Sequence, residues 1–288
     1  MERRSRSYVQ LIKPGITLSN TLTGIAGFFL AASTVPLNVL VLVGVIFGVA
    51  LIIASACVFN NVLDRKIDTR MKRTKKREVA NGVINVYKAL VFGSVLGVIG
   101  FVTIIILTNV LTFFLGVIAF FWYIVVYGYA KRKTVFSTII GGVAGALPPV
   151  AGYTALTGRI DLAAIILFVI LFLWQMPHFY AIAMFRRSDY SSAKLPIWSV
   201  TYGMKSTKKQ ILMFTITYAL ASGLLYVFGY THIFYLILSV AVSAYWLHQA
   251  IAFYNKVDDE KWARNMFGAS LVVLLSTCFL IAVGGYLP

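Results

Sequence analysis

Nine long apolar runs, separated by short polar connections, constrain this chain more than any other feature of its sequence. Each run approaches or exceeds the ~20 residues that an α-helix needs to cross the hydrocarbon core of a bilayer. A chain that is 60% hydrophobic and only 12% charged cannot cover that much apolar surface as a soluble globule. The sequence therefore predicts an all-α fold, a polytopic membrane helical bundle whose main surroundings are the lipid bilayer.

The runs predict nine transmembrane helices that together form a single domain over residues 1–288. The second helix is expected to continue beyond the hydrocarbon as far as Asp68. The fifth is expected to kink at Pro148-Pro149, and its glycines between 141 and 152 favour close helix packing, with substrate lining as the alternative. The predicted spans are 16–34, 38–60, 85–107, 110–129, 138–156, 162–184, 210–230, 233–254 and 266–286.

The lysines and arginines indicate how these helices are oriented. Of the 26, 24 lie in the segment before the first span and in the segments after the second, fourth, sixth and eighth spans. Because cytoplasmic loops carry the excess of Lys and Arg, we expect a cytoplasmic N-terminus and a C-terminus outside. The net charge of +17 then reflects membrane topology, and we expect no nucleic acid partner.

The basic opening segment has two interpretations. Residues 1–15 followed by an apolar run resemble a signal peptide, with Ala31-Ala32-Ser33 as a cleavage site. A first helix that is not cleaved is favoured, because residues 19–21 are polar and further spans follow at once.

Three oxygen-bearing side chains recur every four residues at the end of the second span: Asn60, Asp64 and Asp68. On a helix they project from one face, with neighbours about 6 Å apart along the axis. Two carboxylates at that distance repel by about 3 kcal/mol at an effective dielectric of 20. A hard cation such as Mg²⁺, which takes carboxylate and phosphate oxygens, would offset this repulsion. The alternative is a helix end where polar residues simply leave the membrane, although this does not require the fourfold spacing.

A second polar segment closes the sixth span. Gln175 and His178 are expensive to place among lipid tails, so we expect them to face the interior of the bundle or a cavity. Asp189 lies just beyond the membrane on the same side as Asp64 and Asp68. A salt bridge to a neighbouring arginine is the alternative role for Asp189.

These segments carry a resemblance to a known family. The stretch 60–68 with the cationic residues 71–77 resembles the first acidic motif of the UbiA superfamily of intramembrane prenyltransferases. Within it, 174–183 and 189–193 look like the haem O synthase branch, and 145–152 is similar to another block of that branch. The resemblance covers nearly the whole chain.

The chain also departs from these patterns at two places. Most of the superfamily has a second Asp where this chain has Ala193, as in the haem branch, which argues against relatives that prenylate aromatic acids. The segment Lys194–Ser199 differs from the loop that the haem branch usually has after its Asp-Tyr motif.

The resemblance implies transfer of a farnesyl group from farnesyl diphosphate to a vinyl group of protohaem IX (haem B) with addition of water, giving haem O and diphosphate. It implies Mg²⁺ as cofactor and haem B as substrate. Diphosphate departure requires neutralisation of its developing charge by metal and cationic groups. The residues predicted to be catalytic and to bind the metal are Asn60, Asp64, Asp68 and Asp189.

Further residues are candidates to contact the two substrates. The sequence cannot distinguish residues that bind the diphosphate from residues that bind the haem propionates. The candidates for these two anions are Arg73, Lys76, Arg77, Lys131 and Lys194. Those for haem binding are His178, Trp174 and Gln175, where His178 is either an axial ligand of the iron or a hydrogen-bonded interior residue. Those for shielding an allylic cation are Tyr123, Tyr127 and Tyr153, with Trp122 and Trp174 also available. Membrane anchoring or core packing is the alternative for each aromatic residue.

Two other functions compete with this one. A prenyltransferase of the same superfamily could act on a quinone precursor or another aromatic, and a secondary transporter could use the cationic inner face for an anionic metabolite. Transporters bind near the midplane between broken, duplicated helices, whereas these acids gather at one face without a clear repeat. The resemblance further implies a multi-pass protein of the bacterial inner (plasma) membrane, an active site facing the cytoplasm, and haem-copper oxidase assembly partners.

Overall fold

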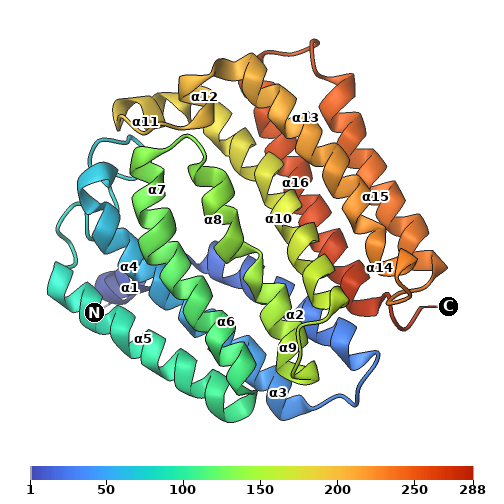
Figure 1. The fold of residues 1–288 in the computed structure, drawn as a ribbon. Helices are drawn as coiled ribbons and strands as arrows, with labels where there is room; N and C mark the ends of the chain where they lie inside the picture. Colours follow the sequence, from blue (N-terminus) through green and yellow to red (C-terminus); the bar gives the residue numbers. More distant parts are fainter. Residues whose placement is uncertain (1, 288) are drawn as a thin grey trace.

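The structure is a computed structural model that describes residues 2–287, with side chains described from Ser7 onward. The side chains of Arg3, Arg4 and Arg6, which contribute to the predicted cytoplasmic charge, lie outside the described part. Within that part the regular structure is entirely helical, and nine helices are long and apolar enough to cross a membrane (Figure 1). The predicted nine-helix membrane bundle is therefore confirmed.

The helices follow the predicted runs closely at most positions. The second span continues to Asp68, as expected, and contains a π-helical turn, η1. In chain order the elements are α1 (Glu2–Leu11), α2 (Pro14–Ala32), α3 (Val39–Gly44), η1 (Val45–Val49), α4 (Ala50–Asp68), α5 (Val86–Leu107), α6 (Val110–Phe121), η2 (Trp122–Tyr127), α7 (Gly128–Lys133), α8 (Ser137–Gly145), α9 (Leu147–Thr157), α10 (Leu162–Phe185), α11 (Arg187–Ser192), α12 (Trp198–Thr201), α13 (Gly203–Ser222), α14 (Leu224–Val227), α15 (Ile233–Ala252) and α16 (Asp259–Val283).

Two helices begin seven residues before the predicted spans. α13 begins at Gly203 rather than 210, and α16 begins at Asp259 rather than 266. Both prefixes are polar, so apolar content alone does not reveal them. The start of α16 has a local cause, because the Asp258 carboxylate accepts a hydrogen bond from the Lys261 backbone N–H and caps the first turn.

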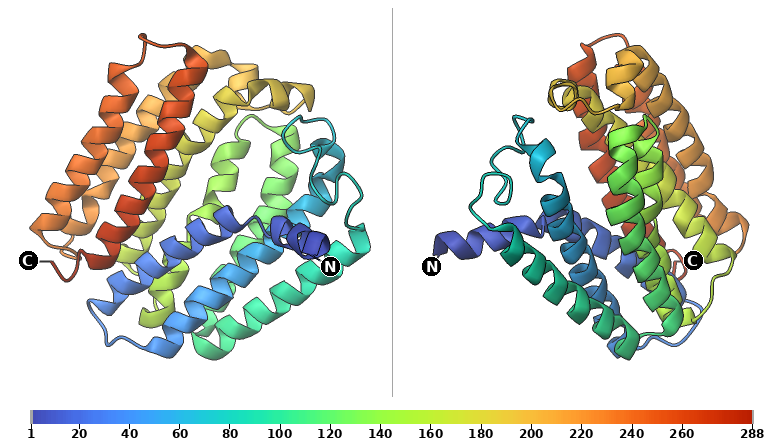
Figure 2. Two further views of the ribbon diagram at one scale, coloured as in Figure 1. Left: turned by 180° about the vertical axis from the view of Figure 1, so that it is seen from behind. Right: turned by 60° about the vertical axis from the view of Figure 1, so that its left-hand side comes forward.

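The helices form two groups with the site between them. α4 packs along α5, and α2 packs along α9, whereas α10, α13, α15 and α16 pack with one another. Contacts of α16 with α2, and of α10 with α8 and α9, join the groups (Figure 2). The cationic connections after α4, α7, α10 and α15 gather at one end of the molecule, which is the upper end in Figure 1.

The expected kink in the fifth span is present. The span is interrupted at Ala146, between α8 and α9, and Pro148 and Pro149 lie in the first turn of α9, where a missing N–H costs little. A Cβ added at Gly152 would lie 1.8 Å from the Gly24 carbonyl oxygen, and one at Gly27 would lie 2.0 Å from that of Pro149. The glycine-rich segment therefore brings the backbones of α2 and α9 into direct contact, as predicted for packing.

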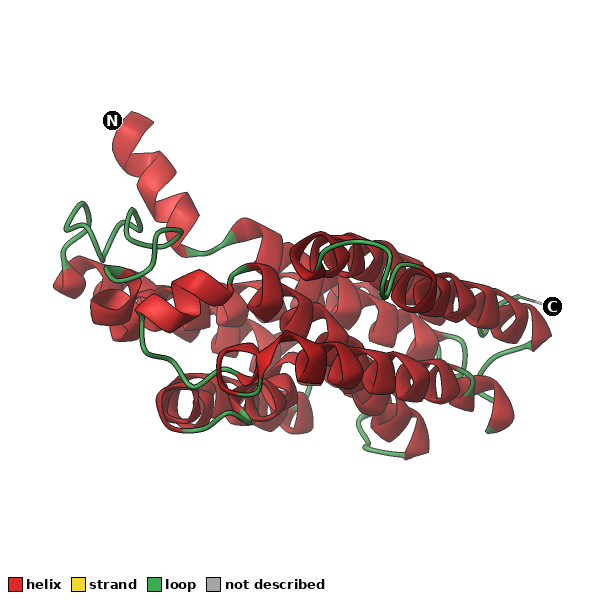
Figure 3. Ribbon diagram, turned by 90° about the horizontal axis from the view of Figure 1, so that it is seen from above, coloured by secondary structure: helices red, strands yellow, loops and turns green. Residues whose placement is uncertain are grey.

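A sharp turn separates α1 from the first span. Lys13 has φ 48°, in the left-handed region, and Pro14 begins α2 directly after it. This turn sends α1 away from the bundle, as Figures 2 and 3 show from two directions.

Candidate active site

The three predicted oxygen ligands on α4 are all buried on one face of the helix. Asn60, Asp64 and Asp68 are 5%, 9% and 3% exposed. The Asn60 side-chain amide donates a hydrogen bond of 3.0 Å to Oδ2 of Asp64. The fourfold spacing therefore does bring these side chains into one row, as the helical period requires.

Cations from three other segments contact this row. Lys131 and Arg132 of α7 both pair with Asp64, with 2.9 Å between an Arg132 nitrogen and Oδ1. Nη1 of Arg77, in the loop after α4, lies 2.9 Å from both carboxylate oxygens of Asp68. Each acid thus has a guanidinium partner, and Asp64 has an ammonium as well, which offsets the cost of burying the carboxylates.

Lys13 completes this set from the turn between α1 and α2. Its ammonium donates a hydrogen bond of 3.0 Å to the Asn60 side-chain oxygen. Burial lowers the pKa of Lys13 to about 8, and the positive charges of Arg77 and Lys131 act in the same direction. The left-handed turn at Lys13 is what directs this side chain inward, and sequence reasoning treated Lys13 only as a topology signal.

Asp189 lies at the same end of the bundle on α11, where it is 5% exposed. Its Oδ1 accepts a hydrogen bond of 2.9 Å from the Lys72 backbone N–H, and Ser192 donates one to the Arg70 carbonyl. Asp189 therefore binds the loop that follows Asp68, although it is not among the residues that line the cavity described next.

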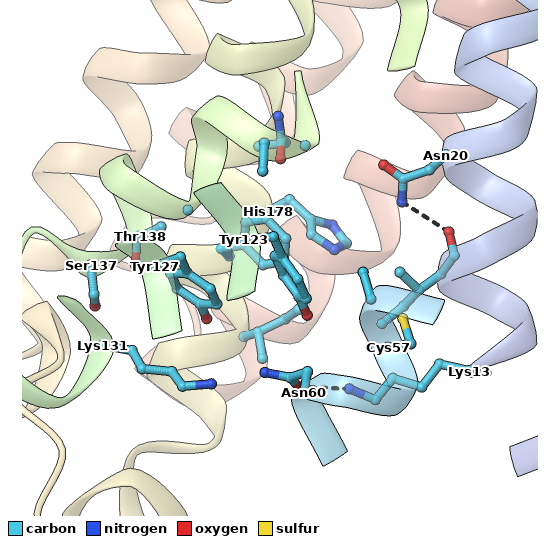
Figure 4. A pocket seen from close by; sticks show the side chains of 18 of the residues that line it. Lys13, Asn20, Cys57, Asn60, Tyr123, Tyr127, Lys131, Ser137, Thr138 and His178 are labelled. Atoms are coloured by element: carbon cyan, nitrogen blue, oxygen red, sulfur yellow. Dashed lines mark hydrogen bonds between the residues drawn. The ribbon is translucent and has the colours of Figure 1, made fainter. Parts of the chain in front are cut away.

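A cavity of about 780 Å³ opens above the row of acids. α2, α4, η2, α8, α10 and α16 all contribute to its wall. Figure 4 shows Lys13, Asn60, Lys131, Tyr123 and Tyr127 directed into the same space. The two tyrosine rings stack with their centroids 5.5 Å apart, and the Lys131 ammonium lies over the Tyr127 ring, 5.2 Å from its centroid.

His178 lies deeper in the same cavity, between two aromatic rings. Its ring stacks on Trp174 with centroids 4.9 Å apart and contacts Phe267 at 5.0 Å. Nδ1 of His178 is 2.7 Å from Oγ of Ser270, and the Trp174 indole N–H donates to the Ser270 carbonyl at 2.9 Å. One residue of α16 thus holds both side chains of α10.

The Ser270 hydroxyl lies between two possible acceptors. Its Oγ is 2.6 Å from the Phe267 carbonyl oxygen and 2.7 Å from Nδ1 of His178, and its one hydrogen serves one of them. When that hydrogen goes to Phe267, Nδ1 of His178 is the donor to Ser270 and Nε2 keeps its lone pair, as in a metal ligand. Among the described residues Nε2 has no hydrogen-bond partner.

The remaining predicted site residues divide into two groups. Arg73, Arg77, Lys131 and Gln175 line the cavity, and Gln175 is held by hydrogen bonds to the carbonyls of Gly142 and Leu171. The structure does not bring the others to its wall; they are Lys76, Lys194, Tyr153 and Trp122.

Each of the residues outside the cavity has another environment. Lys76 and Lys194 are exposed. Trp122 donates to the Ile140 carbonyl at 2.7 Å. Tyr153 is buried and donates to Asp161, 2.9 Å away, near the opposite end of the bundle. Tyr153 lies near the end of the fifth predicted span, which runs from the cytoplasmic side outward. The sequence therefore already indicated that Tyr153 lies far from the acids.

Several residues of the site carry no strong sequence signal. Arg132 pairs with Asp64, Tyr190 of α11 lines the cavity, and two further arginines, Arg186 and Arg264, lie on its wall. Burial raises the pKa of the Tyr190 phenol, and the positive charges of Arg73 and Arg77 oppose this rise. Tyr190 thus lies within the electrostatic reach of both the α4 loop and α10.

The oxygen donors suit Mg²⁺ in chemistry and in number. Among the described residues no group of three His, Cys, Asp or Glu side chains forms a complete metal cage. Mg²⁺ does not require one, because it keeps waters and is bound by one or two carboxylates together with substrate phosphates. Asn60, Asp64 and Asp68, on the wall of one cavity, fit this pattern.

Comparisons with known proteins agree with this arrangement. The profile of the UbiA prenyltransferase family matches residues 20–275. The chain is 42% identical to the protoheme IX farnesyltransferase of Pectobacterium carotovorum and 40% identical to that of Yersinia enterocolitica, over 98% of this chain and 96% of each relative.

The fold also resembles that of solved structures. A digeranylgeranylglyceryl phosphate synthase aligns with a TM-score of 0.79 at 20% identity, over 99% of both chains. A UbiA homolog from Archaeoglobus fulgidus, bound to GPP and Mg²⁺, aligns with a TM-score of 0.68 at 16% identity, over 96% of this chain and all of that one. At these identities the likeness shows a shared fold.

Proposed function

Because the chain belongs to the UbiA prenyltransferase family, we propose that it is a membrane prenyltransferase that converts haem B to haem O. The farnesyl C1–oxygen bond of farnesyl diphosphate breaks, and C1 bonds to the terminal carbon of a haem vinyl group. Water adds to the other vinyl carbon and loses a proton, and diphosphate leaves. The relatives that carry the protoheme IX farnesyltransferase name match almost the whole length of this chain.

One structural observation carries the proposal. A single cavity has an acidic row with cationic partners at one end and an aromatic-lined imidazole farther in, whose Nε2 has no hydrogen-bond partner among the described residues. The polar end suits a metal–diphosphate group, and the imidazole suits haem iron. Two such different substrates must meet in one space for the reaction to occur.

We assign the polar end to diphosphate departure. Asn60, Asp64 and Asp68 would hold Mg²⁺, and Asp189 would support the site from α11 through its hydrogen bond to the loop that follows Asp68. Bound Mg²⁺ neutralises charge that develops on the diphosphate as its bond to farnesyl breaks. Arg73, Arg77 and Lys131 then donate hydrogen bonds to phosphate oxygens, and Lys13 adds a further cation beside Asn60.

The aromatic residues of the cavity shield the carbocation. The stacked rings of Tyr123 and Tyr127 lie next to the acids, so they face the carbon from which diphosphate departs. A desolvated cation–π contact contributes about 1–2 kcal/mol.

The proposal extends to the setting of the enzyme. The whole chain acts as one prenyltransferase domain, since helices from α2 to α16 line the cavity. This multi-pass protein lies in a bacterial plasma membrane with the cavity toward the cytoplasm, where most of its cations lie. Its product would pass to the assembly of haem-copper oxidases.

A reconstituted assay tests the function. Purified full-length protein receives haem B, farnesyl diphosphate and Mg²⁺, and the haem products are separated and weighed by mass spectrometry. We expect a product heavier than haem B by one farnesyl group and one hydroxyl. Prenylation of a quinone precursor but not of haem B would favour the other acceptor class, and uptake of an anion into vesicles without conversion would favour a transporter.

A further inference from the structure

Two arginines contact one aromatic ring on the wall of the cavity. Arg186 follows the last residue of α10, and Arg264 lies near the start of α16, where it is exposed. Their guanidinium carbons lie 5.5 and 4.9 Å from the centroid of the Phe185 ring, and all three residues line the cavity. Two cationic groups from two helices therefore flank the same ring.

A continuous set of aromatic contacts joins these arginines to His178. Phe185 meets Phe267 edge-on with centroids 5.7 Å apart, and Phe267 contacts the His178 ring at 5.0 Å. From position 178 to position 186 an α-helix rises about 12 Å. The arginines thus lie at the membrane-surface end of the wall that carries the imidazole.

Arg186 and Arg264 differ from the cations near the acids in their carboxylate partners. Arg77 and Arg132 are paired with the carboxylates of Asp68 and Asp64. Arg186 has no carboxylate partner among the described residues, and Arg264 has Glu260, four residues earlier on α16. Two guanidinium groups and one carboxylate therefore leave a net positive charge at this place.

We infer that Arg186 and Arg264 bind the two propionates of haem B, while His178 faces its iron. This inference rests on the proposed function and adds the orientation of the acceptor. The propionates are two carboxylates on one edge of a flat apolar ring, and they would be costly to place in the hydrocarbon. Guanidinium groups at the membrane surface match them in charge and in planar geometry.

This assignment separates the two anions of the reaction. Arg73, Arg77 and Lys131 serve the diphosphate on the side of α4, whereas Arg186 and Arg264 serve the propionates at the ends of α10 and α16. The vinyl groups of protohaem lie on the edge opposite the propionates. Holding the propionates at these arginines therefore directs the vinyl edge into the cavity that also contains the acids of α4.

Esterified haem provides the test. Full-length protein is titrated optically with haem B and with haem B dimethyl ester, whose propionates carry no charge. We compare the wild type, Arg186→Gln, Arg264→Gln, the double variant, and the control Arg187→Gln, which removes the exposed arginine next to Arg186.

We expect each cavity variant to raise the Kd for haem B about tenfold, with the larger effect for Arg186→Gln, because a hydrogen bond to a charged group is lost. The dimethyl ester should bind the wild type and the double variant equally, which also verifies that the variant folds. Arg187→Gln should bind haem B as the wild type does, and the KM for farnesyl diphosphate should not change in any variant.

The inference is overturned if the dimethyl ester binds the wild type as tightly as haem B does, or if the double variant loses equal affinity for both. Failure of the proposed function looks different, because the wild type would then form no haem O from haem B and farnesyl diphosphate. Normal turnover together with unchanged haem affinity in the double variant would contradict the propionate site alone.

Discussion

Asp64 is the acid of α4 that contacts the largest number of polar side chains. It accepts from Asn60, Lys131 and Arg132, which come from two separate spans. A carboxylate surrounded in this way can bind a metal and can also hold the cations that later serve the diphosphate. Loss of the Asp64 charge is therefore expected to affect both metal binding and the position of the cations.

We expect Asp64→Asn to reduce turnover about 100-fold or more, since transition-state charge is no longer neutralised. Turnover is measured as haem O formed under saturating Mg²⁺. Haem B titration serves as the folding control, because the His178 group does not contact Asp64. Near-normal turnover in a variant that still binds haem B would refute the metal assignment.

Ser270 has a separate effect because its hydroxyl holds the His178 ring through Nδ1. Removing a partner that orients a metal-binding histidine typically costs 10–100-fold in metal affinity. We expect Ser270→Ala to weaken haem B binding within about that range and to change the visible spectrum of the bound haem, whereas Ser270→Thr restores both.

The indole of Trp174 bonds to the backbone carbonyl of Ser270, so this contact survives in both variants. A purely structural role for the hydroxyl would lower stability and leave the spectrum unchanged. An unaltered spectrum in Ser270→Ala would exclude the positioning role.

Among single residues, the sequence predicted the row of Asn60, Asp64 and Asp68 from helical spacing. It predicted the buried His178 from the cost of placing a polar side chain among lipid tails. It did not reveal Lys13, Arg186 or Arg264 as site residues. Their inward direction depends on a left-handed turn and on where helix ends meet, and neither depends on residue type alone.

The helices α2 and α9 approach each other closely at their glycines. Gly152→Ala would place its Cβ 1.8 Å from a backbone oxygen of α2, so the two helices must separate. We expect a loss of stability of at least about 1–3 kcal/mol, as in overpacked cores. Thermal unfolding in detergent measures it.

Gly268 on α16 provides a matched control, because a Cβ there meets nothing within 4 Å. Gly268→Ala should leave the melting temperature unchanged or raise it, since alanine favours helix by up to about 1 kcal/mol. Equal melting temperatures for Gly152→Ala and the wild type would contradict the close approach.

The apolar runs predicted every membrane helix, and their ends mostly to within a few residues. The exceptions, α13 and α16, begin with polar turns that the runs do not include, and α1, α11 and α12 lie outside the runs altogether. Hydrophobicity locates the portion of a helix within the lipid, whereas caps and tertiary contacts decide how far it extends.

For the molecule as a whole, the cavity has two ends with different chemistry. Chelation of Mg²⁺ by EDTA should abolish haem O formation but leave haem B binding intact, because His178 and the arginines of α10 and α16 are separate from the α4 row. Added Mg²⁺ should restore turnover, and assays with and without EDTA measure both properties on one sample. Unchanged turnover in EDTA would contradict the metal-assisted departure of diphosphate.

The contact between the backbones of α2 and α9 has a consequence for how this protein tolerates change. Gly27 and Gly152 do not line the cavity, yet neither has room for even one methyl group. In a library that randomises every codon and is selected for growth, these two positions should retain glycine as strictly as the site retains its carboxylates. Intolerance to replacement would therefore mark two kinds of residue, those that handle the substrates and those that leave no space.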